Sequence, residues 1–294
     1  MAALDTTAFA AALKRLYDAR TVARMAYAEG PLFGMVRKQT DFGGASKQVA
    51  LQYGQTQGRS VTFSTAQTNK TSGKWASFLL TRVKDYALAS IEGEVMEASK
   101  GNAFALLEAA KAQIDSAIKV CSQSLAGAIY GDASGRRGTV SVADGVGNRV
   151  LTLSNPEDIV NFEVGMVLQD YDNVGTTGTV TAVDRDLGKV TVDAGTWTVG
   201  GATDYLIQHG DKDGLLKGLG SWLPSTAPTS GDNFFGLDRS ADVTRLAGVR
   251  YDASALPIEE GLLSAASRLC REGARPDVVM MNPTNYKDII IALG

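Results

Sequence analysis

The stretch Gly54-Gln-Thr-Gln-Gly-Arg-Ser-Val-Thr-Phe-Ser-Thr-Ala-Gln-Thr-Asn-Lys-Thr-Ser-Gly73 decides how this chain is organised. It lies between two runs with strand character and has too few large apolar side chains to form its own core. Val61 and Phe63 alternate with polar residues as in a strand. Such a segment is either disordered or a hairpin arm that becomes ordered on another molecule. This choice separates an enzyme from a protein that assembles.

The sequence on either side of this stretch predicts the two strands of a hairpin. Residues 47–53 alternate around Val49, Leu51 and Tyr53, which is typical of a strand. Residues 75–90 are rich in Phe, Leu, Val and Tyr, and we expect them to form the returning strand.

Helical patterns lie before and after this hairpin. Residues 5–29 predict a helix that Gly30-Pro31 ends. Residues 91–99 predict a short helix, and a long helix follows from Asn102 to Tyr130, after the glycine signal at Gly101. At 1.5 Å per residue the long helix would extend for ~43 Å. Its apolar stripe consists of Leu107, Ile114, Ile118, Cys121, Leu125 and Ile129.

The sequence pattern changes between Gly138 and Leu216, where short apolar runs alternate with Asp-Gly, Asn-Pro and Gly-Gly turn signals. Strands and turns at this density indicate a small antiparallel barrel or sandwich. Residues 180–192 are the best candidate for a hairpin within it. Because helical patterns precede and follow the block, we expect an inserted domain.

The C-terminal part mixes helix and strand signals. Residues 218–236 form a Gly/Pro/Ser connector that contains three aromatic residues, and residues 257–270 predict a helix with proline in its first turn. Residues 276–281 predict a buried strand, and another helix begins at Asn282. The chain then stops within a turn of an apolar run, which predicts that its natural C-terminal portion is missing. The whole pattern predicts an α+β protein.

Composition narrows the classes of function. The 294 residues are 44% hydrophobic and 21% charged, with a net charge of −3 from 29 basic and 32 acidic residues. This is ordinary globular composition, and the weakly acidic balance argues against DNA as the main ligand. Neither a secretion signal nor a run long enough to span a membrane is present in the sequence. The two cysteines, Cys121 and Cys270, predict buried apolar roles and have no metal-ligand spacing.

No residue pattern predicts catalysis. The single histidine, His209, predicts a solvated loop residue, and without a second histidine no Ser-His-Asp triad can be built. The sequence around Asp170 resembles a calcium loop but has no glutamate at the twelfth position, so turn-forming aspartates are expected at Asp170, Asp172, Asp184 and Asp186. We therefore predict no catalytic residue, no cofactor and no metal, and expect a protein that is not an enzyme.

The order of these elements resembles the major capsid protein of tailed bacteriophages, whose shell fold is shared with herpesvirus capsids and encapsulins. Arg275-Pro-Asp-Val-Val-Met-Met-Asn-Pro-Thr-Asn-Tyr-Lys-Asp is similar to the strand and helix of that family's axial domain. The stretch from Ser99-Lys-Gly-Asn-Ala-Phe to Tyr130-Gly-Asp is similar to its spine helix. The resemblance implies five segments: an N-terminal arm (1–46), an extended loop with flanking strands (47–90), a peripheral domain with the spine helix (91–137), an inserted β-barrel or sandwich (138–217), and a connector with an incomplete axial domain (218–294).

The resemblance also implies a function and partners. Family members assemble through hexamers and pentamers into an icosahedral head around double-stranded DNA, which they contact weakly and without sequence preference. The expected partners are copies of the same chain, with scaffolding, portal and decoration proteins as further candidates and no membrane. The expected location is the virion, assembled in the bacterial cytoplasm. The extended loop would supply the subunit contacts, through Arg59, Val61, Phe63, Lys70, Lys74 and Trp75.

Two other functions are compatible with the same residues. An encapsulin-like compartment shell would use the same fold to enclose an enzyme instead of DNA. A surface protein would use the β block as a binding module, although the sequence shows no secretion signal for it.

Overall fold

The computed structural model describes residues 31–39, 41–90, 103–199 and 204–293, with only the backbone of residues 103–109. The chain divides into two compact units, Met1–Phe42 with Arg82–Ser221 and Gly43–Thr81 with Trp222–Gly294. Both contain helices and strands, so the fold is α+β, as the sequence predicted. The helices predicted for residues 5–29 and 91–99 lie outside the described residues.

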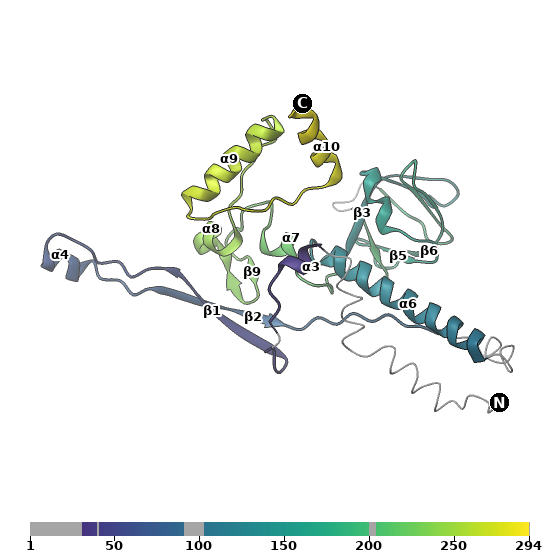
Figure 1. The fold of residues 1–294 in the computed structure, drawn as a ribbon, viewed down its shortest axis with the longest axis horizontal. Helices are drawn as coiled ribbons and strands as arrows, with labels where there is room; N and C mark the ends of the chain where they lie inside the picture. The colour runs from purple at the N-terminus through teal and green to yellow at the C-terminus, as the bar shows by residue number, and fades with distance from the viewer. Residues whose placement is uncertain (1–30, 40, 91–102, 200–203, 294) are drawn as a thin grey trace. The chain divides into compact units, whose positions relative to one another are not determined.

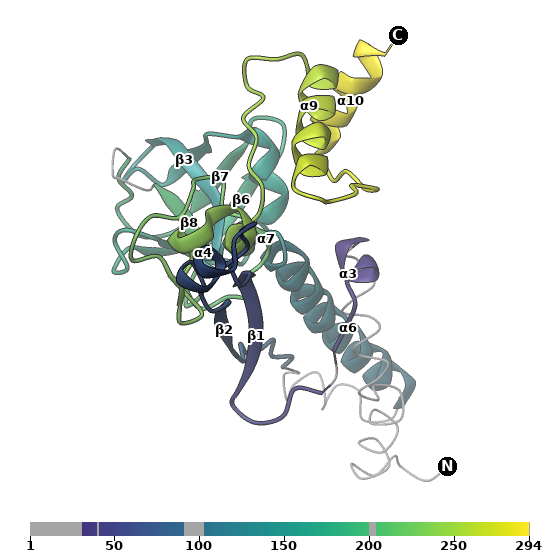
Figure 2. The ribbon, with the colours of Figure 1, turned by 90° about the vertical axis from the view of Figure 1, so that its left-hand side faces the viewer.

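The first unit contains a closed antiparallel barrel. Its strands are β3 (Arg136–Asp144), β4 (Val150–Leu153), β5 (Val167–Asp170), β6 (Thr177–Asp184), β7 (Lys189–Val192) and β8 (Tyr205–Gln208). They close in the order β3-β4-β7-β6-β5-β8, and Figure 2 shows several of them around the barrel. The predicted hairpin at 180–192 is confirmed as β6 and β7, with Asp184 opposite Lys189. Because the sheet closes on itself, no strand edge is left for pairing with another chain.

The barrel is filled by side chains that alternate inward along each strand. The burial pattern of β4 and β7 is strictly alternating, with Leu151 and Val190 fully buried. A short 3₁₀ helix, η1 (Pro156–Asn161), lies between β4 and β5 and is followed by Phe162, which has no exposed surface. The buried core consists of Val140, Leu151, Leu153, Ile159, Phe162, Leu168, Val180, Val190, Val192, Trp197 and Leu206.

Aspartates close two of the barrel's turns, as the sequence predicted. The Oδ1 atom of Asp170 accepts hydrogen bonds from the backbone N–H groups of Asp172 and Asn173, at 2.9 and 3.1 Å. Asp184 does the same for Asp186 and Leu187, at 3.1 and 3.0 Å. These are Asx-type turns, in which the carboxylate satisfies backbone donors of the turn itself.

The long helix α6 (Ala103–Ala128) confirms the predicted 102–130 helix, and its stripe is half-buried from Ile114 to Ile129. The chain passes from α6 into the barrel and returns to the same place. Leu219 donates its backbone N–H to the Ile129 carbonyl at 2.7 Å, and Gly220 donates to the Tyr130 carbonyl at 3.1 Å. The entry and exit of the barrel are therefore adjacent, which is the geometry of an insertion. Among its described residues this unit also contains the helix α3 (Pro31–Met35), and α7 (Leu219–Trp222) ends at the border between the units.

The second unit contains the predicted hairpin and most of the C-terminal helices. Its hairpin strands β1 (Ser46–Gly54) and β2 (Lys74–Thr81) form a long two-stranded ribbon, with α4 (Phe63–Thr68) at its end (Figure 1). The remaining elements are β9 (Asn233–Phe234), β10 (Leu237–Asp238), η2 (Arg239–Asp242), α8 (Val243–Ala247), α9 (Ile258–Arg271) and α10 (Pro283–Ala292). The helices α9 and α10 confirm the two predicted C-terminal helices.

Three sequence predictions in this region are wrong. The returning strand ends at Thr81 instead of Ser90, because Thr81 pairs with Ser46, where β1 begins, and β1 offers no partner to the residues beyond. Residues 276–281 form no strand, and Val278 and Val279 are 53% and 59% exposed. No other described strand lies beside them to satisfy their backbone groups, which a sheet requires. Val61 and Phe63 do not lie in a strand either, since Val61 is in a bend and Phe63 begins α4.

Candidate functional site

The candidate site is the hairpin of residues 46–81, called the arm below. Its two strands pair antiparallel from Ser46 opposite Thr81 to Gly54 opposite Lys74, with a bulge between Gln52 and Gly54. The pairing continues past the strands, because Thr71 donates its backbone N–H to the Gln57 carbonyl at 3.0 Å. The Thr71 hydroxyl in turn accepts from the Gln57 N–H at 3.2 Å. The polar stretch is therefore an ordered extension of the hairpin and not a separate loop.

The two sides of the arm come close together at a glycine. Gly58 has a φ of +139°, and a Cβ added there would lie 3.1 Å from the Lys70 Cα. Both the backbone conformation and the space favour a residue without a side chain. Gly58 brings the two sides of the arm together just before the tip.

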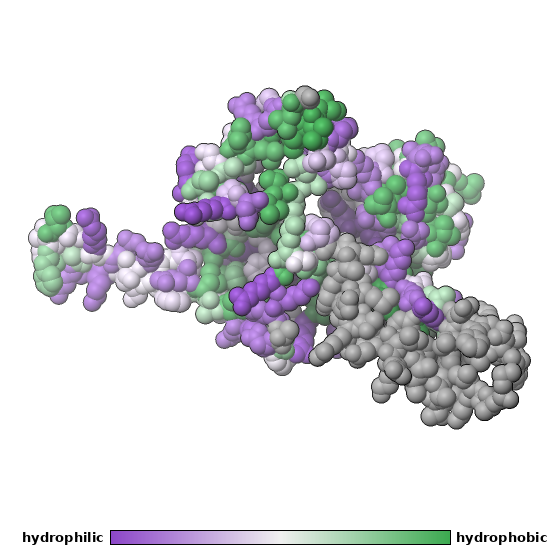
Figure 3. Space-filling view, viewed as in Figure 1, coloured by the Kyte–Doolittle hydropathy of each residue, from purple (hydrophilic) through white to green (hydrophobic). Residues whose placement is uncertain are grey.

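The tip of the arm is a short helix with apolar side chains directed to solvent. Ser60 accepts a hydrogen bond from the Thr62 N–H at 3.2 Å, and the Thr68 hydroxyl donates to the Ser64 carbonyl at 2.9 Å. These local bonds hold the tip without any hydrophobic core. Val61 is 98% exposed and Phe63 is 82% exposed. Figure 3 shows hydrophobic surface at this end of the arm.

The base of the arm is packed within its own unit. Phe78 is only 9% exposed and makes edge-on contacts with Trp222 and Phe234, with ring centroids 5.3 and 6.0 Å away. Leu79 donates its backbone N–H to the Phe235 carbonyl at 2.9 Å. Arg245 donates from its guanidinium to the Tyr53 carbonyl at 2.6 Å. The arm is thus packed at one end, whereas the apolar side chains at the other end are exposed.

All six sequence-predicted contact residues lie on the arm and are exposed: Arg59, Val61, Phe63, Lys70, Lys74 and Trp75. The structure brings Arg59, Phe63 and Lys70 together around a shallow hollow near the tip. Lys74 and Trp75 lie apart from that hollow, at the start of β2, where Trp75 is 67% exposed. Sequence analysis missed the anchors Phe78 and Arg245, whose role depends on contacts between segments more than 140 residues apart in the chain.

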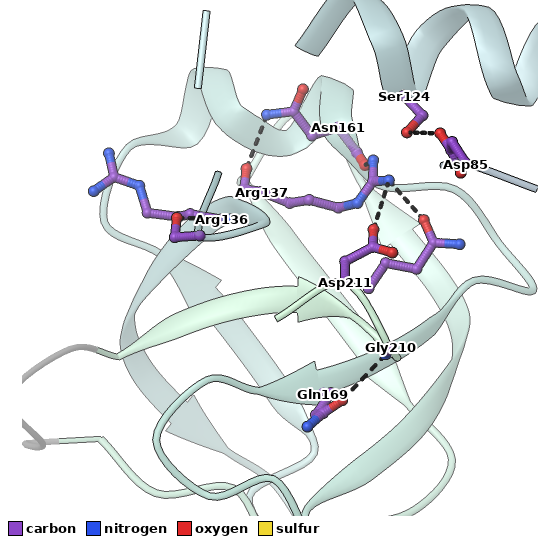
Figure 4. Close-up of polar contacts among 10 residues, drawn as sticks. Asp85, Ser124, Arg136, Arg137, Asn161, Gln169, Gly210 and Asp211 are labelled. Carbon is purple, nitrogen blue, oxygen red and sulfur yellow. Dashed lines mark hydrogen bonds and ion pairs between the residues drawn. The ribbon is translucent and has the colours of Figure 1, made fainter. Parts of the chain in front are cut away.

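A second candidate is the polar cluster where α6 meets the barrel (Figure 4). Arg137 donates to the Gln208 side chain at 2.6 Å and lies 3.9 Å from the Asp211 carboxylate. Asn161 donates to the Arg137 carbonyl at 2.8 Å, and Ser124 on α6 donates to Asp85 at 2.8 Å. Cavities of about 250 and 630 Å³ adjoin the cluster.

The electrostatics of this cluster follow from its burial. Burial raises the pKa of Asp211, the charge of Arg137 opposes that rise, and Asp85 adds to it. Burial also lowers the pKa of Arg137, against the two carboxylates. The nearby Asp132 is penalised by burial as well, yet hydrogen bonds from Ser134 hold its pKa below its ordinary value. The cationic guanidinium of Arg137 is held by Gln208 and Asp211, and it pairs no nucleophile with a base.

The prediction that His209 is a solvated loop residue is confirmed. His209 is exposed directly after β8, and its Nδ1 lies 3.0 Å from the Gln169 side-chain oxygen. Within the described residues, no three His, Cys, Asp or Glu side chains are grouped as ligands for a metal ion. Cys121 is half-buried, in partial agreement with prediction, whereas Cys270 is exposed, contrary to its predicted burial.

Comparisons with known proteins add no assignment: no family model, no curated protein and no solved structure matches this chain. Among the helices of the described residues, none combines the length and the apolar character needed to cross a bilayer.

Proposed function

We propose that this protein is a structural subunit, the major capsid protein of a tailed bacteriophage. It would self-assemble through hexamers and pentamers into an icosahedral head that encloses DNA. In this proposal the fold is the tailed-phage capsid fold, with α6 as its spine helix and the barrel as its insertion domain. The subunit acts by binding copies of itself and not by catalysis.

The observation that carries the proposal is the arm, which is fixed at its base and unpacked at its tip. Exposing Val61 and Phe63 gives no benefit to a lone subunit, since burying apolar surface is worth roughly 25 cal/mol per Å². The backbone pairing of Gln57 with Thr71 nevertheless keeps the tip in a defined shape. A preformed projection loses little conformational freedom when it binds, so its apolar residues can contribute to an interface between subunits.

Repetition makes such contacts sufficient for a shell. A standard interface buries ~1,600 Å² in total. In a closed ring every subunit makes this contact twice, once with each of its two neighbours. Removing one subunit then breaks two interfaces, so the ring is more stable than any pair.

The test is deletion of residues 55–72. Gly54 and Gly73 then become the two central residues of a Gly-Gly turn between Tyr53 and Lys74, a geometry that suits a two-residue hairpin loop. We expect a subunit that is folded, with an unchanged thermal transition, but that forms no particles in electron micrographs. The matched control replaces Gln55 and Gln67 by Ser and keeps the arm. Particles of normal size from the deletion variant would overturn the proposal.

Particles from the full chain also separate a phage head from an encapsulin-like shell. A head made in the presence of packaging proteins holds double-stranded DNA, whereas a compartment shell holds protein cargo. Nuclease-protected DNA in particles purified from infected or reconstituted cells supports the first. Particles that contain an enzyme and no nucleic acid would favour the second.

A further inference from the structure

The charges of this chain are distributed very unevenly. The arm contains four cations, Lys47, Arg59, Lys70 and Lys74, and no acidic residue. Because the whole chain has a net charge of −3 and the arm contributes +4, all other residues together carry −7. The barrel, residues 136–208, holds ten acidic and five basic residues and accounts for −5 of that charge.

Three of the arm's four cations are available for a partner. Arg59, Lys70 and Lys74 are exposed, and the structure records no ion pair for them with any described residue. By contrast, Arg185 of the barrel pairs with Glu163 at 3.0 Å, and Arg239 pairs with Asp232 at 2.7 Å. The positive charges along the arm repel one another, so contact with an acidic surface stabilises them.

One end of the barrel offers such a surface. β3 begins at the joint with α6 and ends at Asp144, so the loops after β3, β5 and β7 lie at the opposite end, called the distal end below. Its described residues are 144–150, 170–177, 192–199 and 204–205. This end contains Asp144, Asp170, Asp172, Asp193 and Asp204, against the single cation Arg149. Asp144, Asp172 and Asp193 are exposed.

We propose that the arm of one copy binds the acidic distal end of the barrel of a second copy. This inference rests on the proposed function and names the partner surface of the same arm. Electrostatic complementarity selects the partner and speeds the encounter, and Val61 and Phe63 supply apolar burial once the arm is docked. A second copy fits better than nucleic acid, because the −7 of the remaining chain repels a polyanion, whereas the barrel brings its own opposite charge to every neighbour.

Three variants test this contact by exchanging charge. The first, the arm variant, carries Arg59→Glu and Lys70→Glu, and the second, the barrel variant, carries Asp144→Lys and Asp172→Lys. The third carries all four substitutions. A matched control for the arm variant is Arg271→Glu with Arg275→Glu, which changes the net charge equally at exposed positions outside the arm. Asp277→Lys with Asp288→Lys is the matched control for the barrel variant. Association of nuclease-treated protein is measured by sedimentation over a range of concentrations.

We expect the arm variant and the barrel variant each to need about tenfold or more protein to associate, because like charges then face one another. The four-substitution variant returns towards the wild-type concentration, and both controls stay near it. Mixing the arm variant with the barrel variant also restores association, since each arm then meets an opposite barrel on another copy. If the arm bound its own barrel, mixing would restore nothing, and that outcome overturns the inference.

Other outcomes are equally decisive. If the wild-type chain forms particles but the arm variant associates normally, or the exchange restores nothing, the proposed contact is wrong while the capsid function stands. If nuclease treatment alone abolishes wild-type association, the arm's partner is nucleic acid and the inference is overturned. If the wild-type chain forms no assembly under any condition, the proposed function itself fails. Raising the salt from 0.05 to 0.5 M weakens the wild-type contact, because the Debye length falls well below the ~10 Å found at 0.1 M.

Discussion

The barrel and the arm are both antiparallel β structure, yet they obtain their order in different ways. The barrel closes on itself and buries Leu151, Phe162 and Trp197 almost completely. The arm satisfies its backbone by pairing but leaves Val61 and Phe63 in solvent. Beyond its packed base, hydrogen bonds therefore give the arm its shape, whereas side-chain burial gives the barrel its stability. The comparison shows which of the two regions has a buried apolar core and which leaves apolar side chains exposed.

The strongest test of the barrel is Phe162→Ala. Phe162 is fully buried, and its ring lies 3.2 Å from the position that a Cβ on Gly138 would occupy. Truncating a buried Phe costs about 3–5 kcal/mol through lost burial and the cavity left behind. We expect the free energy of unfolding of the barrel, measured in denaturant by tryptophan fluorescence, to fall by that amount.

The matched control for this prediction is Val160→Ala, two residues away. Val160 is 70% exposed, so its truncation should change the free energy of unfolding by no more than about 0.5 kcal/mol. If both substitutions had the same effect, the barrel would not depend on its interior, and the contrast with the arm would be lost.

A glycine at the joint should show the next largest effect. A Cβ on Gly218 would overlap the carbonyl oxygens of Ala128 and Ile129, at the end of α6 where the chain returns from the barrel. We expect Gly218→Ala to destabilise the first unit by about 1–3 kcal/mol, because the backbone must move apart. Calorimetric melting measures the change.

Gly127→Ala, on α6, is its counterpart. A Cβ on Gly127 meets nothing within 4 Å, and alanine is favoured over glycine in a helix by roughly 0.5–1 kcal/mol. The two Gly→Ala substitutions should therefore move the melting temperature in opposite directions. A stabilising Gly218→Ala would show that the barrel is not held at this joint.

Sequence reasoning succeeded where local residues decide the structure. The turns at Asp170 and Asp184 depend on a carboxylate and the next few N–H groups, and the β6–β7 hairpin depends on neighbours in the chain. Closure of the barrel depends on β3 pairing with β8, whose strands lie more than 60 residues apart, so alternation could not distinguish a barrel from a sandwich.

The failures have the same origin. The apolar run at 276–281 has the composition of a buried strand, but composition does not show whether a partner strand is beside it. At the tip, one alternation of Val61 and Phe63 is too short a pattern to tell a strand from the six-residue helix α4. For the candidate site, the sequence predicted which residues are exposed on the arm but not the anchors that hold its base.

The polar cluster predicts a pH effect of intermediate size. The pKa of Asp211 is raised by burial and held down by Arg137, so its folded pKa lies above its unfolded value of about 3.9. Its contribution to stability is therefore present below the unfolded pKa and is lost as the pH rises through the folded pKa. We expect Arg137→Met to raise the Asp211 pKa further and to extend that loss to higher pH. The free energy of unfolding at pH 7 should also fall by about 1–2 kcal/mol, because Gln208 loses its hydrogen-bond donor.

Carboxyl chemical shifts of Asp211 and melting temperatures at pH 4 and pH 7 measure these changes. Arg149→Met removes the same charge at the distal end of the barrel and should leave the Asp211 titration unchanged. A lower Asp211 pKa in Arg137→Met would contradict the assignment of Arg137 as the group that favours the carboxylate.

The smallest effect on folding is expected at the tip of the arm, and it separates folding from association. Phe63→Ser removes an 82% exposed ring and should change the free energy of unfolding by no more than about 0.5 kcal/mol. Phe78→Ser on the same arm removes a ring packed against Trp222 and Phe234 and should lower stability clearly. Under the proposed function both should weaken assembly, but only Phe63→Ser should do so with an unchanged melting curve, since its ring is largely exposed in the single chain. Equal loss of stability in the two variants would mean that the tip is part of the subunit's own core and that the distinction between barrel and arm is wrong.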